Sequence, residues 1–357
     1  MLDTQRCYDL FPGLFQGTEH APWSRKGAHI TPKALADLAS MEGSYHGIVY
    51  EGEVYILDAK PGNTLSRGTA TLLDMYRAII TAPEPVPNVE FVFFDLDLPP
   101  NVPAWGYAAR QNEEADLWLI PDFGHWTWSQ PKVGSYNQVR RLAAAIDRKD
   151  GPNHVAWEDK NPTLLWRGRL SGWWRDDMYD ASKGHGWSDV QGMDWGSRTD
   201  VEAKHLSMPD HCTHKYLAHV EGVSYSGRLK YLQNCESVIV MPELDWQQHW
   251  YGLLQADGPN QNYVRVRRDW KDLPEKMDEL LADDEFAHRI AKNSARTFRD
   301  RYLTPAAEAC YWRALLARWR EASFEPELYE VKNGVSQIRG VSLESFLWQR
   351  RLEWDPS

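Results

Sequence analysis

Apolar residues along this chain recur with two periods, one typical of helices and one typical of strands. Spacings of three and four residues predict helices, whereas alternation or short unbroken apolar runs predict strands. The two kinds of segment follow one another through most of the sequence, which is the pattern of a layered α/β protein. The predicted helices are residues 31–41, 69–81, 133–148, 228–234, 245–254, 273–282, 284–302 and 306–319. The predicted strands are residues 89–94, 117–121, 163–166, 215–220, 237–242 and 263–266, with a hairpin over 47–57.

The alternation of strands and helices stops at the turn Asp150-Gly151-Pro152 and then begins again. A chain of 357 residues is long for a single core and long enough for two domains. We therefore expect an α/β domain over residues 1–150, a second over 151–315 and a C-terminal tail over 316–357. Residues 171–210 are rich in Trp, Asp and Gly, and their pattern assigns no element to them.

Composition excludes several classes of protein. With 42% hydrophobic and 25% charged residues the chain is typical of a globular protein, and no stretch of eighteen apolar residues predicts a membrane span. The formal net charge of −11 would repel a phosphate backbone, so no nucleic-acid partner is expected. The 18 Trp and 16 Tyr suit an enzyme that packs flat rings against sugars, although core packing accounts for them equally well.

The segment 211–236 carries the most specific chemistry in the sequence. A predicted strand leads into a turn from Gly222 to Gly227, and the following predicted helix carries Arg228 and Lys230 in its first turn. Small residues let a ligand approach the backbone, helix N-termini attract anions, and a guanidinium holds two phosphate oxygens at once. The segment therefore reads as a cradle for a diphosphate. The alternative is an ordinary strand-turn-helix corner whose basic side chains are solvated.

Two carboxylates follow the predicted strand 89–94, at Asp95 and Asp97. Such a pair at a strand end suits a general base, a divalent metal ligand or a loop cap. An apolar strand ending in Asp-x-Asp also occurs in haloacid-dehalogenase phosphatases, where the first Asp is the nucleophile. Those enzymes place Thr or Val where Pro99 stands here, so this alternative is weak.

An aromatic loop follows the predicted strand 117–121. Asp122 is expected to cap the loop, and His125, Trp126 and Trp128 form either an acceptor platform or a packed corner. A separate group, Cys212 with three nearby histidines, invites a zinc interpretation, but its spacing lacks the second ligand pair of a structural site.

Six motifs, in order along the chain, resemble glycosyltransferase family 90, the protein O-glucosyltransferase and capsule-associated-protein xylosyltransferase family. They span residues 7–312, and their order and spacing are more specific than any one of them. The sequence departs from the animal O-glucosyltransferases at Arg169-Leu170-Ser171-Gly172, which leaves the choice between glucose and xylose open. The motifs are Phe94-Asp95-Leu96-Asp97-Leu98-Pro99, Ile120-Pro121-Asp122-Phe123-Gly124-His125-Trp126-Thr127-Trp128, Trp166-Arg167-Gly168, the block 211–236, Asp245-Trp246 and Cys310-Tyr311-Trp312.

This resemblance implies a GT-B-type fold, with two Rossmann-like domains facing a cleft and a tail that packs back toward the first domain. It implies an inverting enzyme that transfers glucose or xylose from a UDP-sugar to a hydroxyl of a glycan or protein. Asp97 would be the base, and His125, Trp126 and Trp128 would bind the acceptor. The donor site would comprise Arg167, Gly168, Val223, Ser224, Tyr225, Ser226, Gly227 and Arg228. A catalytically inactive carbohydrate-binding relative remains the alternative, although such a protein has no reason to keep both Asp97 and Arg228.

No cofactor is expected, and a divalent metal at Asp95 and Asp97 is not favoured, since arginines already supply charge. The four cysteines permit three pairings; the resemblance implies Cys212 with Cys235 and Cys7 with Cys310. It also implies the lumen of the secretory pathway (Golgi or endoplasmic reticulum), a monomer, and membrane attachment only through an anchor outside this chain. Because residues 1–30 show no apolar core of a signal peptide, a cytoplasmic protein with free thiols is the alternative.

Overall fold

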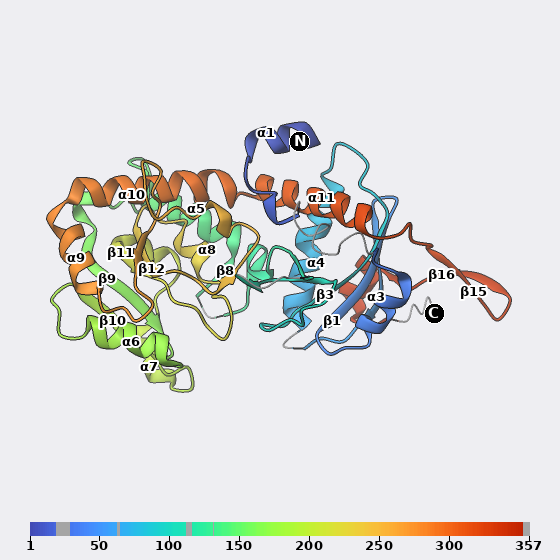
Figure 1. Ribbon diagram of the computed structural model, residues 1–357, viewed down its shortest axis with the longest axis horizontal. Coiled ribbons are helices and arrows are strands. Elements are labelled where there is room, and N and C mark those ends of the chain that lie inside the picture. Colours follow the sequence, from blue (N-terminus) through green and yellow to red (C-terminus); the bar gives the residue numbers. More distant parts are fainter. Residues whose placement is uncertain (19–28, 63–64, 112–115, 131, 353–357) are drawn as a thin grey trace. The chain divides into compact units, whose positions relative to one another are not determined.

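The computed structural model describes residues 1–18, 29–62, 65–111, 116–130 and 132–352. The chain divides into two compact units, coloured along the sequence in Figure 1. Unit 1 comprises Met1–Trp126, Trp246–Gly252 and Pro305–Ser357, and unit 2 comprises Thr127–Asp245 and Leu253–Thr304. The boundary placed at residue 150 from the sequence lies inside unit 2, because helix α5 (Tyr136–Asp147) packs against other elements of that unit.

Unit 1 contains a mixed six-stranded sheet in the order β17-β2-β1-β3-β4-β6. The hairpin expected over 47–57 is present as β1 (Ser44–Tyr50) and β2 (Glu53–Ala59), joined at Glu51 and Gly52, whose φ angles are 50° and 82°. Two positive φ values suit the twist of a two-residue hairpin turn. Strand β1 also pairs antiparallel with β3 (Val89–Phe94), and parallel pairing begins only beyond β3. The sheet is therefore not parallel throughout, as a Rossmann-like sheet would be.

Helix α11 (Pro305–Ala322) packs against α4 (Leu65–Ile80) and β3 in unit 1. Two buried indoles of α11 form hydrogen bonds across this contact. The Trp319 Nε1–H donates to the Glu90 carbonyl at 2.8 Å, and the Trp312 Nε1–H donates to Asp74 at 2.8 Å. The predicted disulfide between Cys7 and Cys310 is present and ties the N-terminal segment to α11.

The remaining elements of unit 1 are short. The helical ones are α1 (Thr4–Leu10), α3 (Pro32–Ala39), the 3₁₀ turn η1 (Phe123–His125) and α12 (Leu343–Gln349). The strands are β4 (Trp105–Gly106), β5 (Ala109–Arg110), β6 (Trp118–Leu119), β13 (Trp246–Gln247), β15 (Tyr329–Lys332), β16 (Val335–Ile338) and β17 (Val341–Ser342).

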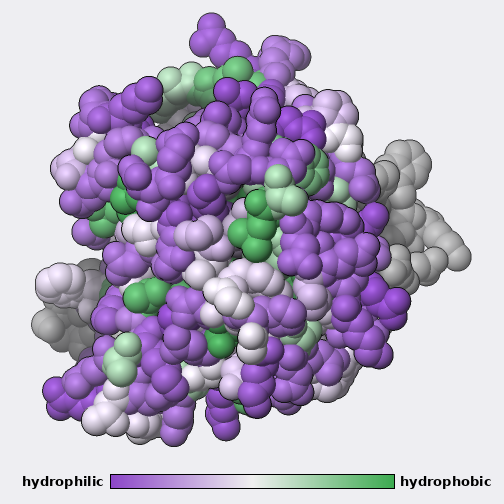
Figure 2. All heavy atoms as spheres, turned by 90° about the vertical axis from the view of Figure 1, so that its left-hand side faces the viewer, coloured by the Kyte–Doolittle hydropathy of each residue, from purple (hydrophilic) through white to green (hydrophobic). Residues whose placement is uncertain are grey.

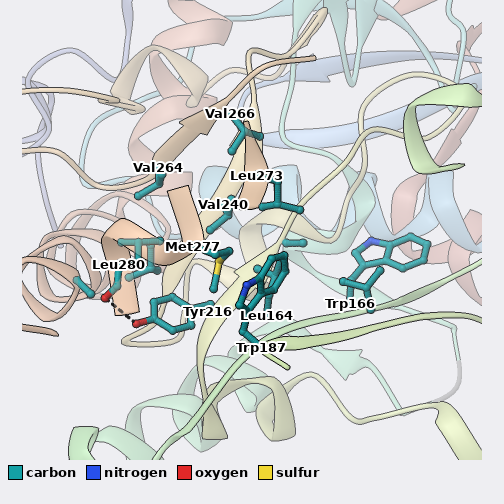
Figure 3. Close-up of a cluster of buried hydrophobic side chains, with 14 of the residues drawn as sticks. Leu164, Trp166, Trp187, Tyr216, Val240, Val264, Val266, Leu273, Met277 and Leu280 are labelled. Carbon is teal, nitrogen blue, oxygen red and sulfur yellow. Dashed lines mark hydrogen bonds between the residues drawn. The ribbon is translucent and has the colours of Figure 1, made fainter. Parts of the chain in front are cut away.

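Unit 2 is built on a five-stranded parallel sheet in the order β10-β9-β11-β12-β14. Alternate residues of the strands point to one face and meet apolar side chains of the covering helices (Figure 3). Tyr216 anchors this core, since its ring is buried and its hydroxyl donates to the Leu280 carbonyl at 3.1 Å. The strands are β9 (Asn161–Gly168), β10 (Ser188–Gly192), β11 (His214–Ala218), β12 (Val238–Pro242) and β14 (Val264–Val266), with the short pair β7 (Thr127–Trp128) and β8 (Gly134–Ser135) outside the sheet.

The helices predicted after residue 150 agree with the structure in part. The predicted helix 245–254 is wrong, because this segment contains the strand β13 and the 3₁₀ turn η4 (Tyr251–Leu253). Residues 171–210, which the sequence pattern left unassigned, hold α6 (Trp173–Ser182), β10 and α7 (Arg198–Lys204). The other helical segments are η2 (Trp157–Asp159), η3 (Pro209–Thr213), α8 (Leu229–Leu232), α9 (Leu273–Ala282), α10 (Asp284–Thr297) and the π turn η5 (Phe298–Tyr302).

The face of the molecule seen in Figure 2 is mostly hydrophilic, and its hydrophobic side chains lie in small separate groups. A search of the described residues finds no helix with the length and apolar character needed to cross a membrane.

Candidate active site

The strand-turn-helix segment predicted over 211–236 is present in unit 2. Strand β11 ends at Ala218, the turn is closed by the Gly222 N–H donating to the Ser224 carbonyl at 3.0 Å, and α8 follows. Helix α8 spans only Leu229–Leu232, however, and Arg228 is its N-cap residue rather than part of its first turn. Four residues carry little helix dipole, so anion binding here depends on side-chain charge more than on the helix start.

Lys230 does not act as a second phosphate-binding cation in this geometry. Its side chain is buried, and its Nζ donates to the Gly227 carbonyl at 2.9 Å, so it braces the turn from behind. A Cβ on Gly227 would lie 3.3 Å from that Nζ and 3.5 Å from the Trp128 ring. A side chain at this position would therefore fit tightly between Lys230 and Trp128.

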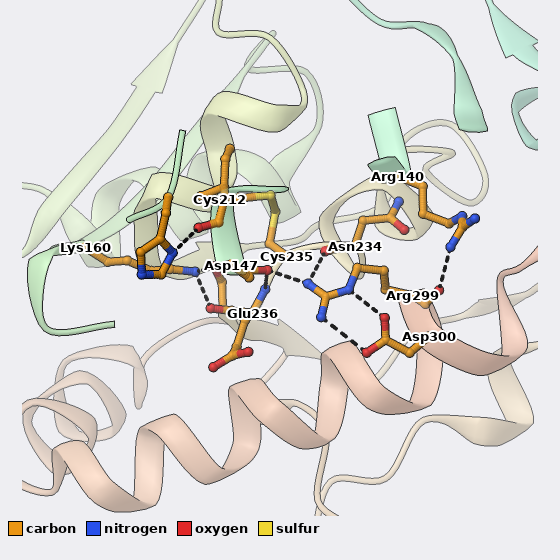
Figure 4. Close-up of polar contacts among 12 residues, drawn as sticks. Arg140, Asp147, Lys160, Cys212, Asn234, Cys235, Glu236, Arg299 and Asp300 are labelled. Carbon is orange, nitrogen blue, oxygen red and sulfur yellow. Dashed lines mark hydrogen bonds and ion pairs between the residues drawn. A yellow bond between two sulfur atoms is a disulfide. The ribbon is translucent and has the colours of Figure 1, made fainter. Parts of the chain in front are cut away.

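A disulfide and a buried ion-pair network hold the segment in place (Figure 4). The predicted bond between Cys212 and Cys235 joins the residues before β11 and after α8. It also excludes the zinc interpretation, because it leaves no Cys212 thiolate to bind a metal. Asp147 accepts from the Glu236 N–H at 2.8 Å and pairs with Lys160 at 2.7 Å and with Arg299. These contacts fix the C-terminal end of the segment to α5 and η5.

A pocket of about 480 Å³ opens beside this segment in unit 2. Its size is within the range of sites that enclose small ligands. Side chains from β9, α6, the turn and the loops before η3 line it. They include Trp128, Arg167, Arg169, Arg175, Trp195, His205, His211, Ser226 and Arg228.

Arg228 and Arg175 place two guanidinium groups over the same indole. Their Cζ atoms lie 5.6 and 5.9 Å from the centre of the Trp166 ring. Burial, and then the charge of Arg175, lower the pKa of Arg228 to about 10, so it remains a cation at neutral pH. No carboxylate of the described residues lies within ion-pair distance of the Arg228 guanidinium. Both guanidinium groups are partly buried, so their mutual repulsion is only partly screened by water, and an anion in the pocket would relieve it.

Arg167, the other predicted donor-site arginine, is already paired. Its Nη2 contacts both carboxylate oxygens of Asp189, at 2.8 and 2.9 Å. This two-point contact crosses from β9 to the neighbouring β10 and neutralises most of the charge. Gly168 is needed beside it, since a Cβ there would lie 2.8 Å from the Trp166 ring and 3.3 Å from Arg228.

Histidines near the pocket are held in their neutral form. Burial lowers the pKa of His211 to about 4, against the opposing effect of its hydrogen bond to the Ser207 carbonyl. Burial, followed by the charges of Arg228 and Arg175, lowers the pKa of His219 to about 3. The same combination of burial and nearby cations lowers the pKa of His205. The local excess of positive charge therefore resides in the arginines.

The other members of the predicted donor set occupy different positions. Ser226 lines the pocket, Ser224 and Tyr225 are buried in the turn, and Val223 is 70% exposed. Arg169, Arg175 and Trp195 line the pocket but were missed from the sequence, because they lie in or beside a stretch whose pattern assigned no element.

In unit 1, Asp95 and Asp97 lie beyond the end of β3 and have different surroundings. Asp95 is fully buried, and its Oδ1 accepts the Gly62 N–H at 3.0 Å. The Asp97 side chain is 44% exposed, and Arg67 Nη1 donates to its Oδ1 at 2.7 Å. Because the strand stops at Phe94, these two carboxylates do not share one strand face. The burial of Asp95 also argues against its use as a phosphatase nucleophile.

The predicted acceptor residues have different surroundings within their own units. Asp122 caps η1 as expected, accepting the Gly124 N–H at 2.7 Å. His125 is buried in unit 1, with its Nδ1 at 3.0 Å from Glu308 Oε1. Trp126 lies beneath the Arg77 guanidinium, whose Cζ is 4.9 Å from the ring centre. Trp128 lines the pocket of unit 2.

These features define an α/β protein in which a parallel sheet supports a pocket lined by several arginines. The family model described as Glycosyl transferase family 90 matches residues 5–343. The chain belongs to glycosyl transferase family 90.

Named relatives are similar to this chain over part of their length. Protein O-glucosyltransferase 1 of Rattus norvegicus is 30% identical over 252 residues, which cover 66% of this chain and 62% of that protein. The Homo sapiens protein of the same name is 28% identical with the same coverage. O-glucosyltransferase rumi of Drosophila pseudoobscura pseudoobscura is 28% identical over 265 residues, covering 65% of this chain and 60% of that protein. The matched part of the chain thus spans about three fifths of these relatives.

A solved structure described as Anabaena Alr3699/HepE in complex with UDP-glucose is 13% identical, with a TM-score of 0.31 over 52% of this chain and 53% of that one. A likeness at this level carries no argument about fold or ligand.

Proposed function

We propose that this chain is an inverting glycosyltransferase that moves glucose or xylose from a UDP-sugar to a hydroxyl of a glycan or protein. The observation that carries the proposal is the Arg228 guanidinium, which is partly buried, lies at the pocket of unit 2 over the same indole as Arg175, and has no carboxylate partner among the described residues. A nucleoside diphosphate supplies the missing negative charge, and its oxygens suit guanidinium donors. Membership of glycosyl transferase family 90 supports the same ligand class.

In the proposed reaction, Asp97 removes the acceptor proton while the acceptor oxygen attacks the anomeric carbon. The bond from that carbon to the diphosphate breaks, and UDP leaves with the electron pair. Arg228 stabilises the charge that develops on the departing oxygens. The hydrogen bond from Arg67 orients the Asp97 carboxylate. The reaction requires the donor pocket and Asp97 to serve one centre, and we propose the GT-B arrangement for this purpose.

The positions of the tryptophans suggest which of them bind the sugar donor and which the acceptor. Trp128 and Trp195, at the rim of the donor pocket, supply flat faces for the nucleotide or its sugar. Trp126 remains our candidate for acceptor binding, whereas the burial of His125 favours a role inside unit 1. We propose a monomer in the lumen of the secretory pathway, and the two disulfides support an oxidising compartment.

Asp97→Asn tests the base. We expect transfer to fall by about 10²–10⁴-fold, because the acceptor keeps its proton, while UDP affinity is unchanged. Initial rates with UDP-glucose and UDP-xylose, together with calorimetric titration by UDP, measure the two quantities separately. Asp37→Asn is the matched control, since it breaks an exposed ion pair with Lys33 in the same unit. Turnover of Asp97→Asn close to wild type contradicts the assigned base, and failure of UDP to bind the wild-type chain contradicts the assigned donor site.

A further inference from the structure

Unit 1 contains a buried group of three side chains that the proposed reaction does not use. His125 is the last residue of η1, His249 follows β13, and Glu308 lies in the first turn of α11. Their side chains are 0%, 0% and 3% exposed. Three segments far apart in the sequence thus bring metal-binding side chains to one point.

The distances fit a common central ion. Nδ1 of His125 and Nε2 of His249 lie 3.0 and 3.6 Å from the same oxygen, Oε1 of Glu308, and the ligand atoms of all three residues lie within 4.8 Å of one another. Tetrahedral zinc, with bonds of about 2.0–2.1 Å, separates its ligand atoms by roughly 3.3 Å. Two imidazoles and one carboxylate are a known three-residue zinc set, in which a small ligand such as water completes the coordination.

A second buried histidine–glutamate pair in unit 1, His46 with Glu90, has an arginine partner that Glu308 lacks among the described residues. His46 Nε2 contacts Glu90 Oε1 at 2.8 Å, and Arg339 donates to both oxygens of that carboxylate at 2.9 and 3.0 Å. Glu90 therefore has a fixed cation. At Glu308 a second imidazole takes that place, and among the described residues no Lys or Arg lies within ion-pair distance of it. A buried carboxylate with two imidazoles is completed by a metal cation, which needs both imidazoles neutral.

Supporting hydrogen bonds fix the segments that carry these side chains. Asp122, which caps η1, also accepts from Gln248 Nε2 at 2.8 Å, so the residue next to His249 is tied to the turn that holds His125. On α11, Cys310 is bonded to Cys7 two residues beyond Glu308. Such outer contacts orient metal ligands and favour binding.

We propose that His125, His249 and Glu308 bind a structural zinc ion that fastens α11 to the two histidine-bearing segments of unit 1. The site is distinct from the proposed donor pocket, whose residues all belong to unit 2. Its burial leaves no access for a sugar substrate, so the ion stabilises the unit and takes no part in transfer.

Metal content tests the proposal directly. The full chain, produced without a polyhistidine tag, is equilibrated with ZnCl₂, freed of excess metal and analysed by mass spectrometry of the element. We expect about one zinc per chain in wild type and at least ~100-fold weaker zinc binding in Glu308→Gln and His249→Gln. Because all four cysteines form disulfides, no free thiol competes for the ion.

His46→Gln is the matched control, since it removes a buried histidine from a glutamate that retains its arginine. It should keep the zinc. EDTA should lower the thermal midpoint of wild type and of His46→Gln but not of Glu308→Gln, with folding of each variant checked by circular dichroism. Zinc retention by wild type no greater than by Glu308→Gln and His249→Gln overturns the proposal and leaves the group as a hydrogen-bonded network. UDP binding is independent of this result, so it does not decide the proposed function.

Discussion

The donor pocket of unit 2 and the His125–His249–Glu308 group of unit 1 both bury ionisable side chains, with opposite balances of charge. In the pocket, Arg228 is a partly buried cation, and the nearby buried His211 and His219 are neutral. In the group, the buried carboxylate of Glu308 lies between two buried imidazoles, and no Lys or Arg of the described residues lies within ion-pair distance of it. Because an uncompensated buried charge is costly, the first region favours an anion and the second a cation.

Removing Glu308 should have the largest effect on stability. Glu308→Gln leaves two buried imidazoles without the carboxylate between them, and we expect the free energy of unfolding to fall by about 3–5 kcal/mol. Urea unfolding in EDTA measures this loss without any contribution from bound metal. Glu321→Gln, which breaks the exposed pair with Arg318 on the same helix, should cost little. A loss for Glu308→Gln as small as that of the control would show that the group is not a charged network.

The buried histidines of the pocket should make the protein lose stability in mild acid. The folded-state pKa of His211, about 4, lies below its unfolded value of 6.5, so the unfolded chain binds more protons between these limits. Stability therefore falls as the pH drops from about 6.5 toward 4, by roughly 1.4 kcal/mol per pH unit, or about 2 kcal/mol by pH 5. Urea midpoints at pH 7.5 and 5.0 measure the slope. His211→Asn should flatten it, and an unchanged slope in that variant would assign the acid sensitivity to other groups.

Arg228→Ala should have the most specific effect, since it changes the affinity for ligands that carry a diphosphate. A charge-assisted contact to phosphate is worth about 1.5–3 kcal/mol, so UDP and UDP-glucose should bind about tenfold more weakly or worse. The affinity for uridine, which lacks the diphosphate, should be almost unchanged. Calorimetry on all three ligands measures this contrast.

Two further arginines sharpen the Arg228 result. Arg167→Ala should lower the affinity for UDP less than Arg228→Ala does, because Arg167 already pairs with Asp189. Arg267→Ala, at an exposed pair with Asp269, should change no affinity. Equal UDP affinity in folded Arg228→Ala and wild type would remove the donor-site assignment.

Local patterns predicted many of the longer helices and strands. The hairpin β1–β2, the strands β3, β9, β11, β12 and β14, and the helices α5, α9, α10 and α11 all lie where periodicity placed them, within a few residues at their ends. The predicted helix 245–254 is wrong because Trp246 and Gln247 pair with β5, a partner far away in the sequence. Such pairing overrides local helical spacing.

The site was predictable where a motif names the residue type. Arg228, Gly168 and the disulfide bonds were expected, and the structure places Arg228 in the lining of the pocket, where a Cβ on Gly168 would lie 3.3 Å from its Nη2. Arg175 was not expected, because α6 carries no distinctive spacing, and only its packing over Trp166 brings it beside Arg228. Arg67 was missed for the same reason, since it belongs to α4 and meets Asp97 only in the folded unit.

By itself, the sequence determined the α/β class, the family and the order of the elements, because periodicity, turn residues and motifs are local properties of a chain. The tertiary structure decided which charges have partners. Arg167 meets Asp189 across neighbouring strands, whereas Arg228 packs over Trp166 near Arg175 with no carboxylate of the described residues in reach, and His125 lies against Glu308 instead of facing solvent. These differences arise from burial and from contacts between distant segments, which set the electrostatic free energy of each side chain.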